Sequence, residues 1–169
     1  HYCREGQQKG HRPCYYFDDE FYTDHNADVA ESGAMPLLHY ILHGQAELRR
    51  PCAAFDPHWY RDEYKADLPL THFLREGRAL GCATNPLIDI DYYLSTNPDV
   101  KQAGVDPIEH CMEISWQEGR KPSSQFDLSY YVKTHLGGDA TRNPLKDYLL
   151  RGMALGLATN AESDRGDGK

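Results

Sequence analysis

The chain has 169 residues, of which 26 are acidic and 18 are basic, giving a formal net charge of −8 and a sequence pI near 5.5. An acidic surface repels phosphate backbones and anionic lipid headgroups, so nucleic acid and membrane surfaces are not expected as partners. No apolar run approaches the roughly 20 residues that a membrane-spanning helix needs, so membrane insertion is not expected either.

One residue pattern recurs four times along the chain. Its copies begin at Phe17-Asp18, Phe55-Asp56, Ile88-Asp89 and Phe126-Asp127, with steps of 38, 33 and 38 residues. A period in this range is typical of stacked helical arrays, in which neighbouring units share a core. The pattern predicts an all-α fold, a solenoid-like array of about four two-helix repeats.

The alignment of the copies also predicts their boundaries. Residues 1–13 match the C-terminal part of a truncated repeat, and the second copy is shortened between its two helices. Beyond the last copy, the polar residues 161–169 predict a flexible tail. The full repeats are expected at 14–52, 53–85, 86–124 and 125–160.

Each repeat is expected to hold a first and a second helix. The first has apolar residues at positions i, i+4 and i+5, after an Asp that suits an N-cap. The Asn97-Pro98 pair interrupts this helix in the third copy. The second helix begins at a proline and has a small residue at i+7, and Gly81, Gly119 and Gly156 then predict its end.

The five cysteines form no C-x-x-C pair. Cys14 and Cys52 occupy the same slot of successive repeats, so a packing distance of about 8–10 Å separates them, too far for a disulfide. This favours a reducing, cytoplasmic location, with the cell surface or secretion as the alternative.

A histidine recurs in the second helix, at His1, His39, His72 and His110, with Asp147 in the last copy. It could belong to a row of ligand-facing groups, or it could be hydrogen-bonded across to the next repeat. The second interpretation is favoured because buried polar groups are nearly always paired. Arg49 and Arg120 likewise could bind a carboxylate or sugar hydroxyls, or pair with acidic residues inside the array.

The recurring aromatic pairs have helical spacing and are expected in the core. Tyr15, Tyr16 and Trp116 lie outside the recurring slots, so they are the candidates for an exposed aromatic platform. Two of Asp18, Asp19 and Glu20 could supply a carboxylate pair of the kind that glycosidases use, but acidic residues are ordinary at a helix start. His1, Cys3, His11 and Cys14 could bind zinc, yet two of them fill repeat slots. We therefore expect no catalytic residue, no metal site, no cofactor and no enzymatic activity.

The repeats resemble a short helical repeat of bacterial glycosyltransferases and cell-surface polysaccharide proteins, including proteins similar to rhamnan synthesis protein F. The pattern is approximately FDxxYYxxxxPDVxxxGxxPLxHYxxxGxxEGRxP, and the third copy matches it best, from Asp89 to Arg120. The fourth copy departs from it, with Asp147 in place of the His and Leu155-Gly156-Leu157 in place of Glu-Gly-Arg.

The resemblance implies a non-catalytic interaction or scaffold module in polysaccharide synthesis. Its expected partners are other domains of the parent protein or further copies of the repeat. Two alternatives stay open, namely a carbohydrate-binding module that holds a glycan, and an accessory acceptor-binding region of a glycosyltransferase.

Overall fold

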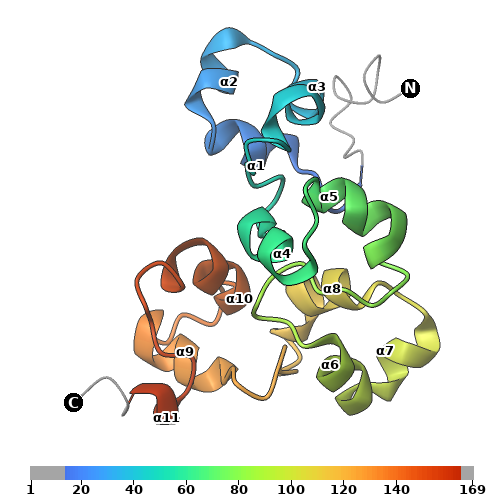
Figure 1. The fold of residues 1–169 in the computed structure, drawn as a ribbon. Coiled ribbons are helices and arrows are strands. Elements are labelled where there is room, and N and C mark those ends of the chain that lie inside the picture. The colour runs from blue at the N-terminus through green and yellow to red at the C-terminus, as the bar shows by residue number, and fades with distance from the viewer. Residues whose placement is uncertain (1–13, 165–169) are drawn as a thin grey trace. The chain divides into compact units, whose positions relative to one another are not determined.

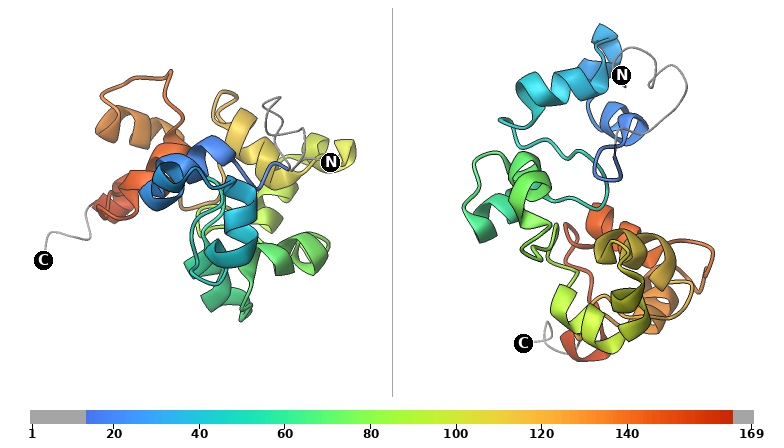
Figure 2. Two further views of the ribbon diagram at one scale, coloured as in Figure 1. Left: turned by 90° about the horizontal axis from the view of Figure 1, so that it is seen from above. Right: turned by 90° about the vertical axis from the view of Figure 1, so that its right-hand side faces the viewer.

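The computed structural model describes residues 14–164, which form helices and no β-strand (Figures 1 and 2). The all-α prediction is therefore confirmed for this part of the chain. The helices in chain order are α1 (Asp19–Asp24), α2 (Ala27–Ser32), α3 (Pro36–His39), α4 (Pro57–Tyr64), α5 (Pro69–His72), α6 (Ile90–Thr96), α7 (Pro98–Ala103), α8 (Pro107–His110), α9 (Leu128–His135), α10 (Pro144–Asp147) and α11 (Ala161–Asp164).

The second helix of every repeat changes its winding halfway along. The α-helices α3, α5, α8 and α10 continue without a break into π-helical turns, in which the backbone bonds span five residues instead of four. The apolar spacing does not predict this change. The four turns are η3 (Tyr40–Gly44), η4 (Phe73–Gly77), η5 (Cys111–Ser115) and η6 (Tyr148–Gly152).

The first helix of every repeat begins at the predicted aspartate. Asp18, Asp56, Asp89 and Asp127 each accept a hydrogen bond from the backbone N–H three residues on, at 3.1, 3.0, 2.9 and 2.9 Å. This pairing satisfies a backbone donor that the helix itself leaves free. In the third repeat α6 ends at Thr96 and α7 begins at Pro98, as the Asn97-Pro98 pair predicts.

The same four aspartates close their repeats. The backbone N–H of each donates to a carbonyl at the end of its own repeat, which we call the closing hydrogen bond. The four closing bonds are Asp18 to Pro51 (3.0 Å), Asp56 to Thr84 (2.8 Å), Asp89 to Pro122 (3.0 Å) and Asp127 to Thr159 (2.8 Å). The start and the end of a repeat are therefore tied together, so each repeat is a closed loop of chain.

The repeats are of two kinds, which alternate. Repeats 1 and 3 have three helices instead of the two expected, because the connection between the two main helices contains α2 or α7. Repeats 2 and 4 lack this helix and end in Ala-Thr-Asn, where repeats 1 and 3 end in Arg-x-Pro. In both, the Thr and Asn side chains donate to a carbonyl before the first helix, that of Ala54 or Gln125.

A pair of repeats, one of each kind, is the larger unit of this chain. Phe17 and Ile88 are 71 residues apart, and so are Phe55 and Phe126. The structure divides into two compact units at the same boundary, between Asn85 and Pro86. Unit 1 therefore contains repeats 1 and 2, and unit 2 contains repeats 3 and 4. After repeat 4, residues 161–164 form the turn α11, where a flexible tail was expected.

One position after the second helix has a left-handed backbone in all four repeats. Gly81, Gly119 and Gly156 have φ angles of 73°, 70° and 64°, which confirms the predicted glycine stops. Leu48 occupies this position in repeat 1 with a φ of 54°. A residue with a Cβ pays about 1–2 kcal/mol for this conformation.

Replacing Leu48 by glycine is therefore expected to stabilise the protein by about 1 kcal/mol, since it relieves the strain at that position. Urea unfolding followed by circular dichroism measures the change. Gly119→Ala is the matched control, and it should lower the free energy of unfolding by a similar amount. Equal stability of both variants and the wild type would show that this backbone position is not strained.

Candidate functional site

The recurring histidines are bonded inside their own repeats. Each lies beside the second residue of the aromatic pair, whose ring is completely buried (0% exposed). The Tyr Oη and His Nδ1 atoms are 3.1 Å apart for Tyr22–His39, 2.9 Å for Tyr60–His72 and 2.7 Å for Tyr93–His110. The histidines thus join the first helix to the second helix of the same repeat. The sequence favours a bond to the next repeat, and these contacts do not reach it. His1 lies outside the described residues.

In repeat 4 the histidine is replaced by Asp147. Its carboxylate accepts a hydrogen bond of 2.7 Å from Tyr131 Oη and forms ion pairs of 2.8 and 2.9 Å with Arg142 and Arg151. Burial by itself raises the pKa of Asp147, but the hydrogen bonds and the charges of the two arginines outweigh it, so the pKa lies below its ordinary value. The Tyr bond is therefore preserved although the residue type has changed.

The small residue at the end of the second helix makes room for the tyrosine hydroxyl. A Cβ atom at Gly44, Gly77 or Gly152 would overlap the Oη atom of Tyr22, Tyr60 or Tyr131. At Gly44 and Gly152 it would also crowd the aromatic ring four residues earlier. These glycines are therefore required by close packing inside one repeat.

Repeat 3 solves the same packing problem with a different pair of residues. Ser115 replaces the glycine and is completely buried, and its hydroxyl donates to the Cys111 carbonyl. The position of Cys111 holds Tyr40, Phe73 or Tyr148 in the other repeats. The small cysteine leaves the space that an aromatic ring fills elsewhere, so the two substitutions compensate each other.

Arg49 and Arg120 form the same clamp in repeats 1 and 3. Arg120 binds Asn97 Oδ1 at 3.0 Å, Asp99 Oδ1 at 2.8 Å and Glu118 Oε2 at 2.7 Å. Arg49 binds Asn26, Asp28 and Glu47 at 3.0, 2.7 and 2.6 Å. Each guanidinium therefore fixes the start of the short helix, α7 or α2, to the end of its repeat.

Among the described repeats, the clamp occurs only in the two that contain the short helix, repeats 1 and 3. The residues at the position of the arginine in repeats 2 and 4 are Cys82 and Leu157. Their backbone N–H groups donate to the carbonyls of Gly77 and Gly152, as those of the two arginines donate to Gly44 and Ser115. The hydrogen bond from Arg120 lowers the pKa of Asp99 to about 2, and the bond from Arg49 lowers that of Asp28. The guanidinium groups are thus occupied by partners within the protein.

The three candidates for an exposed platform lie in different surroundings. Tyr16 is only 2% exposed and packs edge-on against Phe73, with ring centroids 4.7 Å apart, so the expectation of an exposed ring was wrong. Tyr15 is half-buried and packs edge-on against Tyr16. Trp116 is half-buried and borders a cavity in unit 2.

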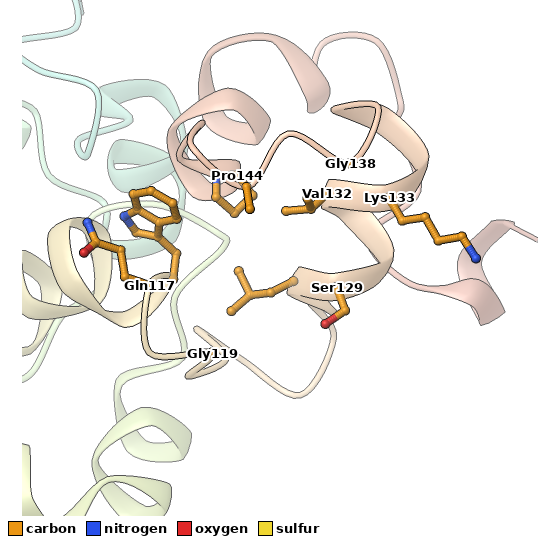
Figure 3. Close-up of a pocket in the computed structure, with 10 residues that line it drawn as sticks. Gln117, Gly119, Ser129, Val132, Lys133, Gly138 and Pro144 are labelled. Carbon is orange, nitrogen blue, oxygen red and sulfur yellow. The ribbon is translucent and has the colours of Figure 1, made fainter.

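The cavity beside Trp116 has a volume of about 650 Å³. It lies between the end of η5, helix α9 and the loop that leads to α10 (Figure 3). Its lining residues are Trp116, Gln117, Gly119, Leu128, Ser129, Val132, Lys133, Gly138, Ala140 and Pro144. We call it the Trp116 cavity. Only Trp116 among these residues was a candidate from the sequence, because the rest become neighbours through the packing of repeat 4 on repeat 3.

The remaining polar candidates take structural positions. Cys14, Cys52, Cys82 and Cys111 are free thiols, and burial raises the pKa of Cys52 and Cys111 to about 12. Between residues 14 and 164, no three His, Cys, Asp or Glu side chains gather closely enough to hold a metal ion. His1, Cys3 and His11 of the suggested zinc set lie outside that range. Within the same range no helix is long and apolar enough to cross a membrane.

Substituting Gly77 by alanine is expected to destabilise unit 1 by about 2 kcal/mol, because the new Cβ displaces the buried hydroxyl of Tyr60. Thermal unfolding followed by circular dichroism measures the loss. Ser115→Ala is the control, since this position already accommodates a Cβ, and its cost should stay near 1 kcal/mol for one hydrogen bond. A Gly77→Ala variant as stable as the wild type would contradict the close packing described.

The Arg120–Asp99 pair predicts a pH dependence of stability. The pKa of Asp99 is about 2 in the folded protein and about 4 in an unfolded chain. The stabilisation is therefore complete above the unfolded pKa and is lost as the pH falls toward the folded pKa. Asp99→Asn should show a shallower decline of melting temperature between about pH 5 and pH 2 than the wild type. Asp91→Asn, an exposed change on α6, is the control that should leave the decline unchanged.

Comparisons with protein-family models, with curated proteins and with solved structures find no match to this chain. The resemblance to the repeats of polysaccharide proteins therefore stays a prediction from the sequence.

Proposed function

We propose that the chain is a non-catalytic helical-repeat module that serves as an interaction surface or scaffold. Its setting is a bacterial protein linked to cell-surface polysaccharide synthesis, and its repeats stack as a solenoid-like array. Other domains of the parent protein and further copies of the repeat are its partners. The setting comes from the resemblance of the repeats, and the non-catalytic role comes from how the recurring polar residues are used.

The observation that carries this proposal is the internal pairing of the recurring polar side chains. His39, His72 and His110 bind buried tyrosine hydroxyls, and Arg49 and Arg120 bind Asn and Asp side chains of their own repeats. A ligand that bound the same histidine Nδ1 atoms or the same guanidinium groups would have to replace bonds that hold the helices together. A structural role for the recurring residues is the simpler account.

The acidic candidates support the same conclusion. Asp18 accepts the backbone N–H of Phe21 as the N-cap of α1, and Asp19 and Glu20 follow in the first helical turn. Acidic residues stabilise a helix at this end by interacting with its dipole. These carboxylates therefore have a structural reason to be where they are.

Carbohydrate binding is the second candidate, and the Trp116 cavity is the observation that favours it. A half-buried tryptophan at a cavity of about 650 Å³ is a feature that stacking of repeats does not require. An accessory acceptor-binding role in a glycosyltransferase is a related possibility, which predicts sugar transfer only together with the other domains of the parent protein.

A glycan-array titration of the wild type and of Arg120→Ala tests the scaffold proposal. We expect no glycan signal that depends on Arg120. We also expect a slightly lower melting temperature for the variant, because the clamp on α7 is lost and exposed ion pairs contribute little to stability. Glycan binding that disappears in folded Arg120→Ala would overturn the proposal. Arg120→Lys, which keeps the charge but not the forked geometry, controls for loss of charge alone. Turnover of a sugar nucleotide by this chain alone would contradict the non-catalytic role.

A further inference from the structure

The Trp116 cavity lies where unit 2 departs from unit 1. The positions of Trp116, Gly119, Val132 and Lys133 are occupied in unit 1 by Gln45, Leu48, Arg61 and Asp62. Features that recur between repeats serve the fold, as the histidine bonds of repeats 1 to 3 and the arginine clamps of repeats 1 and 3 illustrate. A feature confined to one unit is free of that requirement and is the better candidate for a specific ligand.

In the corresponding region of unit 1, repeat 2 is joined to repeat 1 by a different contact. There Thr71 Oγ1 donates to Gln45 Oε1 at 2.6 Å, which links repeat 2 directly to repeat 1. The connection between the two main helices is also shorter in repeat 2, since Phe55 and Gly77 are 22 residues apart whereas Phe126 and Gly152 are 26 apart. The longer connection in repeat 4 contains Gly138 and Ala140, which border the cavity.

The interior of the cavity is apolar and its rim is polar. Val132 and Pro144 point into it from opposite sides, while the polar ends of Gln117, Ser129 and Lys133 lie at its margin or turn outward (Figure 3). Leu128 and Trp116 add further apolar surface to the lining. A volume of about 650 Å³ and a lining of this kind fall within the range of small-molecule sites.

The charges around the cavity balance each other. Lys133 is the one charged side chain in the lining, and the acidic residues Glu118 and Asp139 are the chain neighbours of lining residues. Glu118 is paired with Arg120, and Asp139 accepts hydrogen bonds from Thr141. A rim that carries both positive and negative charges attracts neither anions nor cations strongly, so an uncharged ligand fits it best.

We propose that the Trp116 cavity binds an uncharged saccharide. A sugar ring has an apolar C–H face and a hydroxyl-bearing edge, which correspond to the apolar interior and to the amide, hydroxyl and ammonium groups of the rim. The ring lies against Trp116 and between Val132 and Pro144, and its hydroxyl-bearing edge faces the margin of the cavity, where Ser129 lies (Figure 3). This inference rests on the second candidate function, carbohydrate binding. The site is separate from the recurring histidines and arginines, so an absence of sugar binding at the cavity would leave the scaffold proposal untouched.

Fluorescence of Trp116 provides the test. The chain has two tryptophans, so Trp59→Phe leaves Trp116 as the single reporter. This variant is titrated with glucose, galactose, mannose, N-acetylglucosamine, maltose, lactose and cellobiose, and in parallel with glucuronate, glucosamine and phenol. We expect a saturable change in emission with at least one uncharged sugar, at a lower concentration than with its charged counterparts.

A matched pair of substitutions locates the binding. Val132→Arg fills the cavity with the residue found at this position in unit 1, and it should weaken sugar binding roughly tenfold or more by calorimetry. Arg61→Val, the reverse change in unit 1, should leave the affinity unchanged. Circular dichroism verifies that both variants are folded.

Three results would overturn the inference. These are no response of Trp116 to any sugar in the panel, a response to phenol or to charged sugars alone, and sugar binding of equal strength in folded Val132→Arg. If binding is instead lost in Arg120→Ala and kept in Val132→Arg, the site lies at the recurring residues, and the scaffold proposal fails together with this one.

Discussion

The structure of each repeat depends on a tyrosine hydroxyl that is buried between two helices. Tyr22, Tyr60, Tyr93 and Tyr131 are completely buried, and a buried hydroxyl without a partner costs free energy. A histidine or an aspartate on the second helix supplies the partner, and a glycine or serine one turn later supplies the space. Three recurring residues of the repeat, the tyrosine, its His or Asp partner and the small residue that follows, are thus explained by the need to bury one hydroxyl group.

The second constraint is the closure of each repeat on itself. The aspartate that caps the first helix also donates its backbone N–H to the last residues of the same repeat, and the arginine clamp of repeats 1 and 3 ties the short helix to this end. Repeats 2 and 4 use Thr and Asn side chains for the same purpose. The recurring residues therefore stabilise single repeats, and contacts between repeats are left to residues that vary, such as Gln45 with Thr71 and Glu113 with Lys146.

This division of roles gives the variable residues the greater functional weight. The Nδ1 atoms of the recurring histidines and the guanidinium groups of the recurring arginines are already used in bonds that hold a repeat together. Unit 2, by contrast, has an indole ring at Trp116 and an apolar side chain at Val132 where unit 1 has Gln45 and Arg61, and it keeps the loop residues that repeat 2 lacks. A repeat protein can keep its fold by its recurring residues and acquire specificity through such differences.

The sequence by itself determined the helical class, the aspartate caps and the glycine stops, because each of these depends on neighbours within a few positions of the chain. It did not determine the partners of the histidines and arginines, since the tyrosine, Asn and Asp side chains that bind them lie 12 to 23 residues away in the chain. The Trp116 cavity also depends on the packing of repeat 4 against repeat 3, so its lining has no local pattern. The tertiary structure alone decided these features, because only folding brings such distant residues within bonding distance.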